Sequence, residues 1–394
     1  MKRFANVCCI AFAAAACVGP SGPAGSGSVA PNSYDVQLDG KSSAFNFAAV
    51  AYFPSEVKAH PGDTIRFTTV DRGEPHTVTF GTIIEDALAA FLKLPKDAPP
   101  PSPLPPEILR VPQLLTGQAP NYDFNPAAGQ PCFLDRSDPP KSGPCQKDQQ
   151  RQPEFNGSHV FFNSGIVPDR AVFAVHLADS LKPGVYNYMC LFHGPSMVGH
   201  VAVVDRSEAV PTPAEVKAAG AAELAKLVDG LKPTVDGTAS KLPPGVVMSS
   251  TADPKLPQAL ATEFLPKTVN VPVGGTVTWQ ILLTHTISFN SPPDATDLVF
   301  KAVDGTFHLN LKSILPANSP QAPLPDLSGP TGPPAAMADI DGGSWDGKGF
   351  KSSGLIFMGL QGPSTYKLTF RQPGTYTYKC LIHTDMEGTV KVGQ

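Results

Sequence analysis

The sequence predicts an all-β protein made of two tandem β-sandwich domains, and two observations lead to this prediction. Only 16% of the 394 residues are charged and 44 are prolines, a composition that suits strands with long irregular connections. The second observation is a duplication. Residues 182–203 (KPGVYNYMCLFHGPSMVGHVAV) recur in related form at residues 371–392 (RQPGTYTYKCLIHTDMEGTVKV). In each copy, side chains of different character alternate along two segments that flank a tight loop, which is the pattern of two strands.

The first 33 residues are predicted to be a signal peptide and a flexible tether. Two basic residues precede a short apolar run at residues 7–16, which is too short to span a bilayer. Residues 14–17 resemble a bacterial lipoprotein signal in which Cys17 would be lipidated, although Ala14 replaces the usual Leu. The alternative is ordinary cleavage at a small-residue site, which would leave a soluble exported protein. In both cases we expect a periplasmic or cell-surface protein whose only membrane attachment would be a lipid at Cys17.

The first domain is predicted over residues 34–205, where alternating segments surround a Pro-Gly turn and end in the hairpin of Cys190. Residues 81–158 interrupt it as a Pro-rich insertion with one short helical pattern. Cys132 and Cys145 lie close together in this insertion, and we expect a disulfide between them in an oxidising compartment. A metal site there is disfavoured, because no nearby His or Cys completes a ligand set.

Residues 206–255 are predicted to be a linker with a short helix that begins near Pro213. The sequence leaves open whether this helix is a plain linker or a brace between the domains. The second domain, residues 256–394, repeats four anchor motifs of the first in the same order, which indicates duplication of a whole domain. It carries a Pro/Gly-rich insertion of its own at residues 291–349.

Each Cys hairpin contains several metal-ligand types in one loop. In both copies a His follows the Cys by three residues and a Met follows shortly afterwards. A thiolate, an imidazole and a thioether belong to the ligand set of a mononuclear type 1 copper site, which needs one further imidazole. An upstream His supplies it in each domain. The expected ligands are His76, Cys190, His193 and Met197 in the first domain, and His285, Cys380, His383 and Met386 in the second.

Each of these residues also has an ordinary structural interpretation. The two cysteines could be buried thiols or paired with each other, which would not explain the His three residues after each. A single Met often fills a core, but two in matching loops favour ligation. His76 and His285 could be ordinary strand histidines, but both begin the same alternating segment, H-T-[VI]-[TS]-F, which favours a role as ligands. The remaining histidines have no counterpart in the other repeat and are interpreted as surface or core residues: His60, His159, His176, His200 and His308.

With these motifs the chain resembles the cupredoxin family, the group of plastocyanin, azurin and amicyanin, over most of both domains apart from the insertions. The resemblance implies two Greek-key β-sandwiches, one type 1 copper ion in each, and single-electron transfer. His193 and His383 correspond to the solvent-facing ligand of the family, so redox partners are expected to dock near them over small interfaces. The first copper loop has one more residue between His and Met than the second, so the two reduction potentials are expected to differ.

Two linked domains of this kind also occur in copper nitrite reductases and two-domain laccases, so a copper oxidase or reductase is the main alternative. Such enzymes need a further copper site built from histidines. These often occur in His-x-His pairs, together with a His directly before the Cys that binds type 1 copper. Here Met189 and Lys379 precede the cysteines, and the sequence contains no His-x-His. We therefore expect an electron carrier without catalytic residues. Copper storage or delivery is a third option, which complete thiolate ligand sets disfavour. The net charge of −4 gives no reason to expect a nucleic-acid partner.

Overall fold

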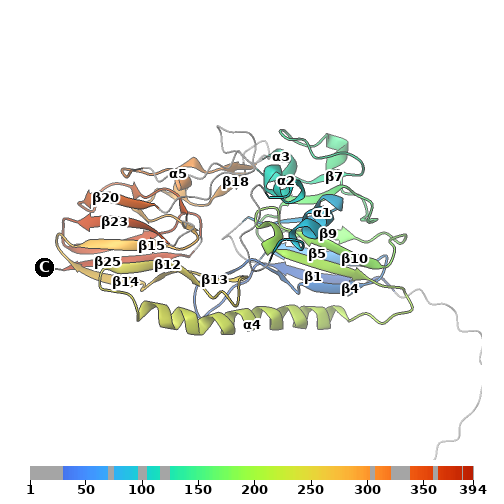
Figure 1. Ribbon diagram of the computed structural model, residues 1–394, viewed down its shortest axis with the longest axis horizontal. Helices are drawn as coiled ribbons and strands as arrows, with labels where there is room; N and C mark the ends of the chain where they lie inside the picture. Colours follow the sequence, from blue (N-terminus) through green and yellow to red (C-terminus); the bar gives the residue numbers. More distant parts are fainter. Residues whose placement is uncertain are drawn as a thin grey trace, which may run out of the picture. The chain divides into compact units, whose positions relative to one another are not determined.

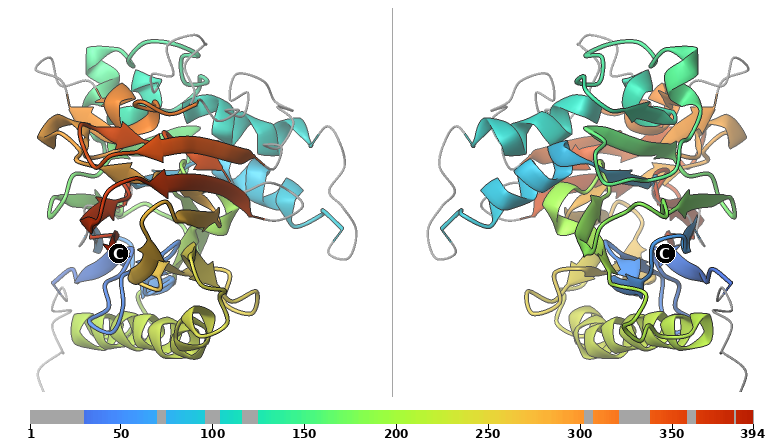
Figure 2. Two further views of the ribbon diagram at one scale, coloured as in Figure 1. Left: turned by 90° about the vertical axis from the view of Figure 1, so that its left-hand side faces the viewer. Right: turned by 90° about the vertical axis from the view of Figure 1, so that its right-hand side faces the viewer.

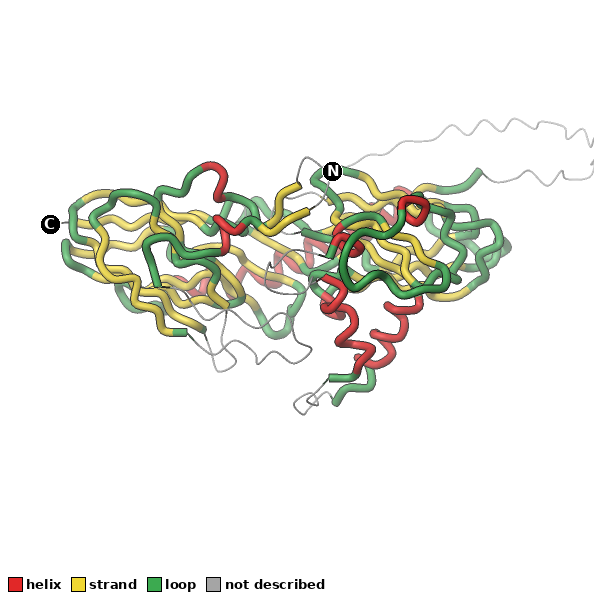
Figure 3. Tube along the Cα trace, turned by 90° about the horizontal axis from the view of Figure 1, so that it is seen from above, coloured by secondary structure: helices red, strands yellow, loops and turns green. Residues whose placement is uncertain are grey.

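Strands dominate the computed structural model, and helices are few (Figure 3), which confirms the predicted all-β class. The predicted signal peptide and tether, including Cys17, lie outside the described residues apart from the last few positions before residue 34. No helix in the described part of the chain is long and apolar enough to span a membrane. The structure describes residues 30–69, 75–95, 104–115, 125–301, 307–320, 338–357, 363–383 and 385–393.

The N-terminal half contains two sheets packed on one apolar core (Figure 1). Its strands are β1 (Ser33–Leu38), β3 (Tyr52–Phe53), β4 (Glu56–Ala59), β5 (Thr64–Thr69), β6 (Thr77–Phe80), β7 (Cys132–Leu134), β8 (Phe161–Ile166), β9 (Val172–His176), β10 (Gly184–Met189) and β11 (Val198–Val203). One sheet has the order β3-β1-β5-β9 and the other β4-β11-β10-β6-β8-β7. Large aromatic side chains from both sheets, including Phe67 and Tyr188, are fully buried between them.

The C-terminal half is a second sandwich with its own core around Trp279. Its larger sheet has the order β2-β13-β12-β15-β23-β20 and its smaller sheet β14-β25-β24-β17-β21. These strands are β2 (Phe47–Ala49), β12 (Val246–Ala252), β13 (Ala259–Leu265), β14 (Thr268–Pro272), β15 (Thr276–Ile281), β17 (Ser288–Phe289), β20 (Asp339–Trp345), β21 (Lys351–Ser352), β23 (Ser364–Phe370), β24 (Gly374–Lys379) and β25 (Glu387–Gly393). Two small two-stranded sheets pair β16 (Thr284–His285) with β22 (Ile356–Phe357) and β18 (Val299–Lys301) with β19 (Phe307–Leu309).

The two halves share their strand pairings as well as their sequence motifs. β1 runs parallel to β5 as β12 runs parallel to β15, and β4 runs parallel to β11 as β14 runs parallel to β25. The hairpin β10–β11 corresponds to β24–β25, and β6 and β17 lie beside β10 and β24 in the same way. Parallel neighbours within a mostly antiparallel sandwich arise because the chain crosses between sheets, as in Greek-key connections.

Strand β2 belongs to the N-terminal part of the sequence but lies in the sheet of the C-terminal half. Its residues pair antiparallel with the start of β13, Ala259 opposite Ala49 and Ala261 opposite Phe47. The backbone N–H of Val50 also donates to the carbonyl of Gln258 at 3.0 Å. The edge of the C-terminal sheet is therefore completed by a strand from far away in the chain.

The helix of the predicted linker is α4 (Pro213–Ala239), which is longer than the short helix expected and continues through Pro233. It begins with a capping box, in which Thr212 accepts a hydrogen bond from the N–H of Glu215. α4 contacts β1 and β3 as well as β12 and β13, so it packs on strands of both halves as a brace. The segment expected to be linker, residues 206–255, also contains β12.

The insertion of the N-terminal half adds β7 to the edge of the sheet that contains β10, and its helix α1 packs on β6, β8 and β10 of the same sheet. Helices α1 (Thr82–Phe91) and α2 (Pro106–Leu115) contact each other (Figure 2), and α3 (Pro126–Gly129) follows. The predicted disulfide is confirmed, with Cys132 and Cys145 joined at a Cα–Cα distance of 5.8 Å. The described part of the C-terminal insertion contains α5 (Leu311–Ile314). Short 3-10 helices are η1 (Lys147–Gln150), η2 (Gly194–Ser196) and η3 (Pro293–Ala295).

Candidate metal centres

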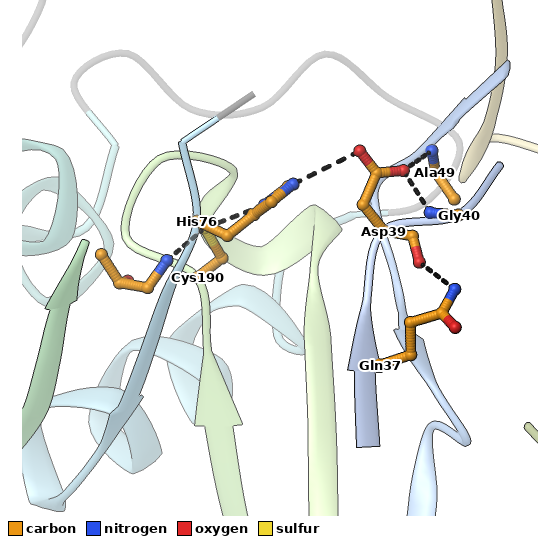
Figure 4. A network of polar contacts seen from close by, with 7 residues as sticks. Gln37, Asp39, Gly40, Ala49, His76 and Cys190 are labelled. Atoms are coloured by element: carbon orange, nitrogen blue, oxygen red, sulfur yellow. Dashed lines mark hydrogen bonds and ion pairs between the residues drawn. The ribbon is translucent and has the colours of Figure 1, made fainter. Parts of the chain in front are cut away.

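Three predicted ligands meet at one end of the N-terminal sandwich. His76 directly precedes β6 and Cys190 directly follows β10, and these strands pair antiparallel, which brings the two residues to the same edge. His193 follows in the loop before η2. The ligand atoms of His76, Cys190 and His193 all lie within 4.8 Å of one another. Sγ of Cys190 is 3.8 Å from Nδ1 of His76, whose side chain points toward it (Figure 4).

The C-terminal sandwich brings its three predicted ligands together in the same way. His285 lies in β16 just before β17, and Cys380 directly follows β24, the partner of β17. Sγ of Cys380 is 3.7 Å from Nδ1 of His285 and 3.3 Å from Nδ1 of His383. The two imidazole centroids are 4.6 Å apart, against 5.1 Å in the first cluster. Within the described residues, no other group of three His, Cys, Asp or Glu side chains lies close enough to hold a metal ion.

The predicted methionines are buried at the far end of each loop. Met197 is fully buried, and Met386 is buried to the same degree, each in the apolar cluster that contains the Cys of its own site. Each loop is closed by a backbone hydrogen bond from the Cys to the Met. The N–H of Cys190 donates to the carbonyl of Met197 at 3.1 Å, and that of Cys380 to the carbonyl of Met386 at 3.0 Å.

The threonine after each upstream His holds the Cys in place, a role that the sequence analysis missed. The backbone N–H of Thr77 donates to Sγ of Cys190 at 3.4 Å, and its hydroxyl accepts the N–H of Leu191 at 2.8 Å. Thr286 makes the same pair of contacts with Cys380 and Leu381, at 3.4 and 2.7 Å. The repeated His-Thr dipeptide was the signal for this role, since both halves keep the Thr together with the ligand.

The neighbouring imidazoles favour the thiolate form of both cysteines. Burial by itself raises the pKa of the Cys190 thiol, but the charge of His193 and the hydrogen bonds from His193 and His76 outweigh it and hold the pKa well below its ordinary value. For Cys380, His383 and His285 oppose burial in the same way and also lower the pKa. The thiolate is the form that binds metal.

A buried carboxylate lies behind the ligand His76. Oδ2 of Asp39 is 3.5 Å from Nε2 of His76, and both side chains are almost fully buried. Burial lowers the pKa of His76, but the hydrogen bonds and charges of Asp39 and Cys190 outweigh it and raise this pKa to about 9. The sequence offered no signal for this contact, because Asp39 lies in an irregular turn far from the ligands along the chain.

The other histidines have partners unrelated to the two clusters wherever a contact is described. Nε2 of His60 is 2.9 Å from the carbonyl of Glu208, and Nδ1 of His176 is 3.0 Å from the hydroxyl of Thr64. His200 and His159 each face a carboxylate, of Glu56 and Asp135 respectively. These contacts agree with the interpretation of these histidines as surface or core residues.

The loop between β10 and β11, which bears His193, also packs against the insertion. α1 contacts both β10 and η2, the short helix between His193 and Met197. Apolar residues of α1, among them Ile84 and Ala87, form a cluster with Met189 and Leu191, which flank Cys190. The insertion therefore supports this loop through α1.

The two clusters define the chain as a β-sandwich protein with two equivalent His-Cys-His centres. No protein-family model and no curated protein sequence matches it. Among solved structures, an amicyanin variant in the Cu(I) form is 12% identical over 44% of this chain and 83% of that chain, with a TM-score of 0.20. A reduced amicyanin variant is 18% identical over 39% and 89%, with a TM-score of 0.19. Amicyanin from Paracoccus versutus is 17% identical over 39% and 88%, with a TM-score of 0.18.

Proposed function

We propose that this chain is an exported blue-copper protein that carries single electrons and binds one type 1 copper ion in each half. The observation that carries this proposal is the occurrence of two buried His-Cys-His clusters at equivalent positions of a duplicated sandwich. A chance cluster would not recur with equivalent strands, the same Cys-x-x-His spacing and the same supporting threonine.

The donor chemistry of each cluster fits copper. One thiolate and two imidazoles, with a thioether in the same loop, suit both Cu(I) and Cu(II). The copper ion would supply one-electron redox chemistry, passing between Cu(II) and Cu(I). His76, Cys190, His193 and Met197 would hold it in the N-terminal half, and His285, Cys380, His383 and Met386 in the C-terminal half.

The surroundings of the ligands suit electron transfer, which requires a geometry that changes little with oxidation state. Cys190 and Cys380 are almost fully buried, and each sulfur accepts the backbone N–H of the threonine that follows the upstream His. Because these contacts come from the sandwich itself, the ligands are held in place independently of the metal.

Partners would exchange electrons through the loop histidines. His193 is partly exposed, whereas His76 is buried, so the loop side is the route to the surface in the N-terminal half. We expect other redox proteins to dock near His193 and near His383 through small transient interfaces. Export to the periplasm or cell surface, with or without a lipid on Cys17, would bring the protein to such partners.

A copper oxidase or reductase, or a copper storage or delivery protein, would be the alternative. We favour the carrier because Met189 and Lys379 stand where such enzymes place a further histidine ligand, and because each centre has a complete type 1 ligand set. A delivery protein would need ligands that exchange readily.

Metal analysis together with the visible spectrum of the purified full chain tests the proposal. We expect two copper ions per chain and an intense thiolate-to-copper absorption band that disappears on reduction and returns on reoxidation. Nitrite and phenols with oxygen should not be turned over. A copper-loaded chain without this band would overturn type 1 binding, and turnover of either substrate would favour the enzyme instead.

A further inference from the structure

Asp39 is held rigidly behind one ligand of the N-terminal centre. It follows β1 with a backbone φ of 60° and is 3% exposed. Its Oδ1 accepts the backbone N–H groups of Gly40 at 2.5 Å and Ala49 at 2.6 Å, which fix the carboxylate in one orientation (Figure 4). The second oxygen, Oδ2, is thereby aimed at His76.

The two nitrogens of His76 face different groups. Nδ1 lies toward the sulfur of Cys190, which makes it the nitrogen available to a metal, and Nε2 lies 3.5 Å from Oδ2 of Asp39. This distance is at the outer limit of a hydrogen bond, yet it is short enough for a strong charge interaction between buried groups. A ligating His commonly donates its second N–H to a carboxylate, which fixes the ring and strengthens the nitrogen as a donor.

We propose that Asp39 is a positioning residue of the N-terminal copper centre: it orients His76 through Nε2 and lowers the reduction potential of that centre. This inference rests on the proposed function. Reduction takes one electron from a reduced donor protein and converts Cu(II) to Cu(I), so the site loses one positive charge. A fixed negative charge nearby stabilises the more positive state, and a more basic imidazole does the same. Both effects of Asp39 favour Cu(II).

The C-terminal half has a serine at the position that corresponds to Asp39. Val36 pairs with Phe67 in β5 as Val247 pairs with Trp279 in β15, so Asp39, three residues after Val36, corresponds to Ser250. Ser250 is also buried and also has a positive φ, of 107°. The equivalent position, after β1 in one half and at a bulge within β12 in the other, therefore carries a carboxylate in the first case and a neutral hydroxyl in the second. This substitution gives the duplicated protein a way to set its two potentials apart.

The test measures the potential of one centre at a time in the full chain. The Cys380→Ser background keeps the N-terminal type 1 centre, and Asp39→Asn removes the charge with little change of shape. Loss of an outer ligand partner typically costs 10–100-fold in metal affinity. We expect the preference for Cu(II) over Cu(I) to fall at least tenfold, which converts to an upward shift of about 59 mV or more for one electron. In a Cys190→Ser background the same substitution should not shift the C-terminal centre.

Asp63→Asn is the matched control. Asp63 is equally buried and also accepts two backbone N–H groups, from Asn32 at 2.7 Å and His60 at 2.8 Å. It precedes β5, whereas Asp39 lies beside the other end of that strand, about 20 Å away for a strand of this length. An unchanged potential in Asp39→Asn with an intact visible band, or an equal shift in Asp63→Asn, would overturn the inference.

A measurement on the wild-type side chains does not depend on the variant folding. In the Cu(I)-loaded, isotope-labelled chain, the Nε2 proton of His76 should exchange slowly with solvent and resonate far downfield, as expected for a proton held by a buried carboxylate. Rapid exchange would contradict the role of Asp39. A chain without a type 1 band would instead defeat the proposed function, so the two failures are distinguishable.

Discussion

Replacing Cys380 with Ser in the full chain should remove half of the thiolate-to-copper absorption and leave the other half unchanged. The band requires a thiolate bound to copper, and a Ser hydroxyl is not deprotonated in the conditions where Cys380 is. The sulfur is buried, lies 3.3 Å from Nδ1 of His383, and accepts the N–H of Thr286, and it is the one thiol of this cluster among the described residues. Quantitative visible spectroscopy with copper analysis measures the effect.

Cys190→Ser is the reciprocal variant and should remove the other half, while the double variant should lose the whole band. Circular dichroism and the midpoint of thermal unfolding of the metal-free proteins serve as controls for the fold. If either single variant abolished the entire band, the two cysteines would belong to one shared centre. If neither reduced it, the thiolates would not be the ligands.

Gly220→Ala should destabilise the protein, contrary to the usual effect of this change within a helix. Replacing Gly by Ala in a helix interior ordinarily stabilises by about 1 kcal/mol. In α4, however, a Cβ on Gly220 would lie 2.7 Å from backbone atoms of Phe53 and Pro54, which cannot move aside as a side chain can. Overpacking of this kind costs about 1–3 kcal/mol. We expect the free energy of unfolding in denaturant to fall by about that amount.

Gly237→Ala in the same helix is the matched control. A Cβ at this position would meet only the flexible end of Lys241, at 3.9 Å, so the ordinary gain of about 0.5–1 kcal/mol should appear. Opposite signs for the two variants would establish that α4 lies directly against the β3 region. Equal stabilisation in both would show that α4 does not pack there in solution.

The sequence allowed prediction of the features that depend on local order along the chain. The Cys, His and Met of each hairpin are close together in the sequence, and comparison of the two repeats identifies an equivalent upstream His in each half. The all-β class followed from alternation and turn residues, and the disulfide from the proximity of Cys132 and Cys145.

Features that depend on long-range packing could not be predicted in this way. The contact of Asp39 with His76 joins an irregular turn to a distant strand, and nothing in the local pattern marks it. Strand β2 is only three residues long, and no periodicity indicates that it pairs with β13 rather than within its own half. The length of α4 was underestimated, because the helix continues through the polar residues after Leu231 and past Pro233 to Ala239.

The exchanged strand β2 has a consequence for dividing this protein into fragments. A piece that begins after the helix would retain the ligands of the C-terminal centre but would expose the unpaired backbone of Ala259 to Ala261. An open strand edge recruits other chains and promotes aggregation. The residues that would bind metal in the C-terminal half and the strand that covers the edge of its sheet therefore lie in different parts of the chain. A C-terminal fragment would keep the first and lose the second.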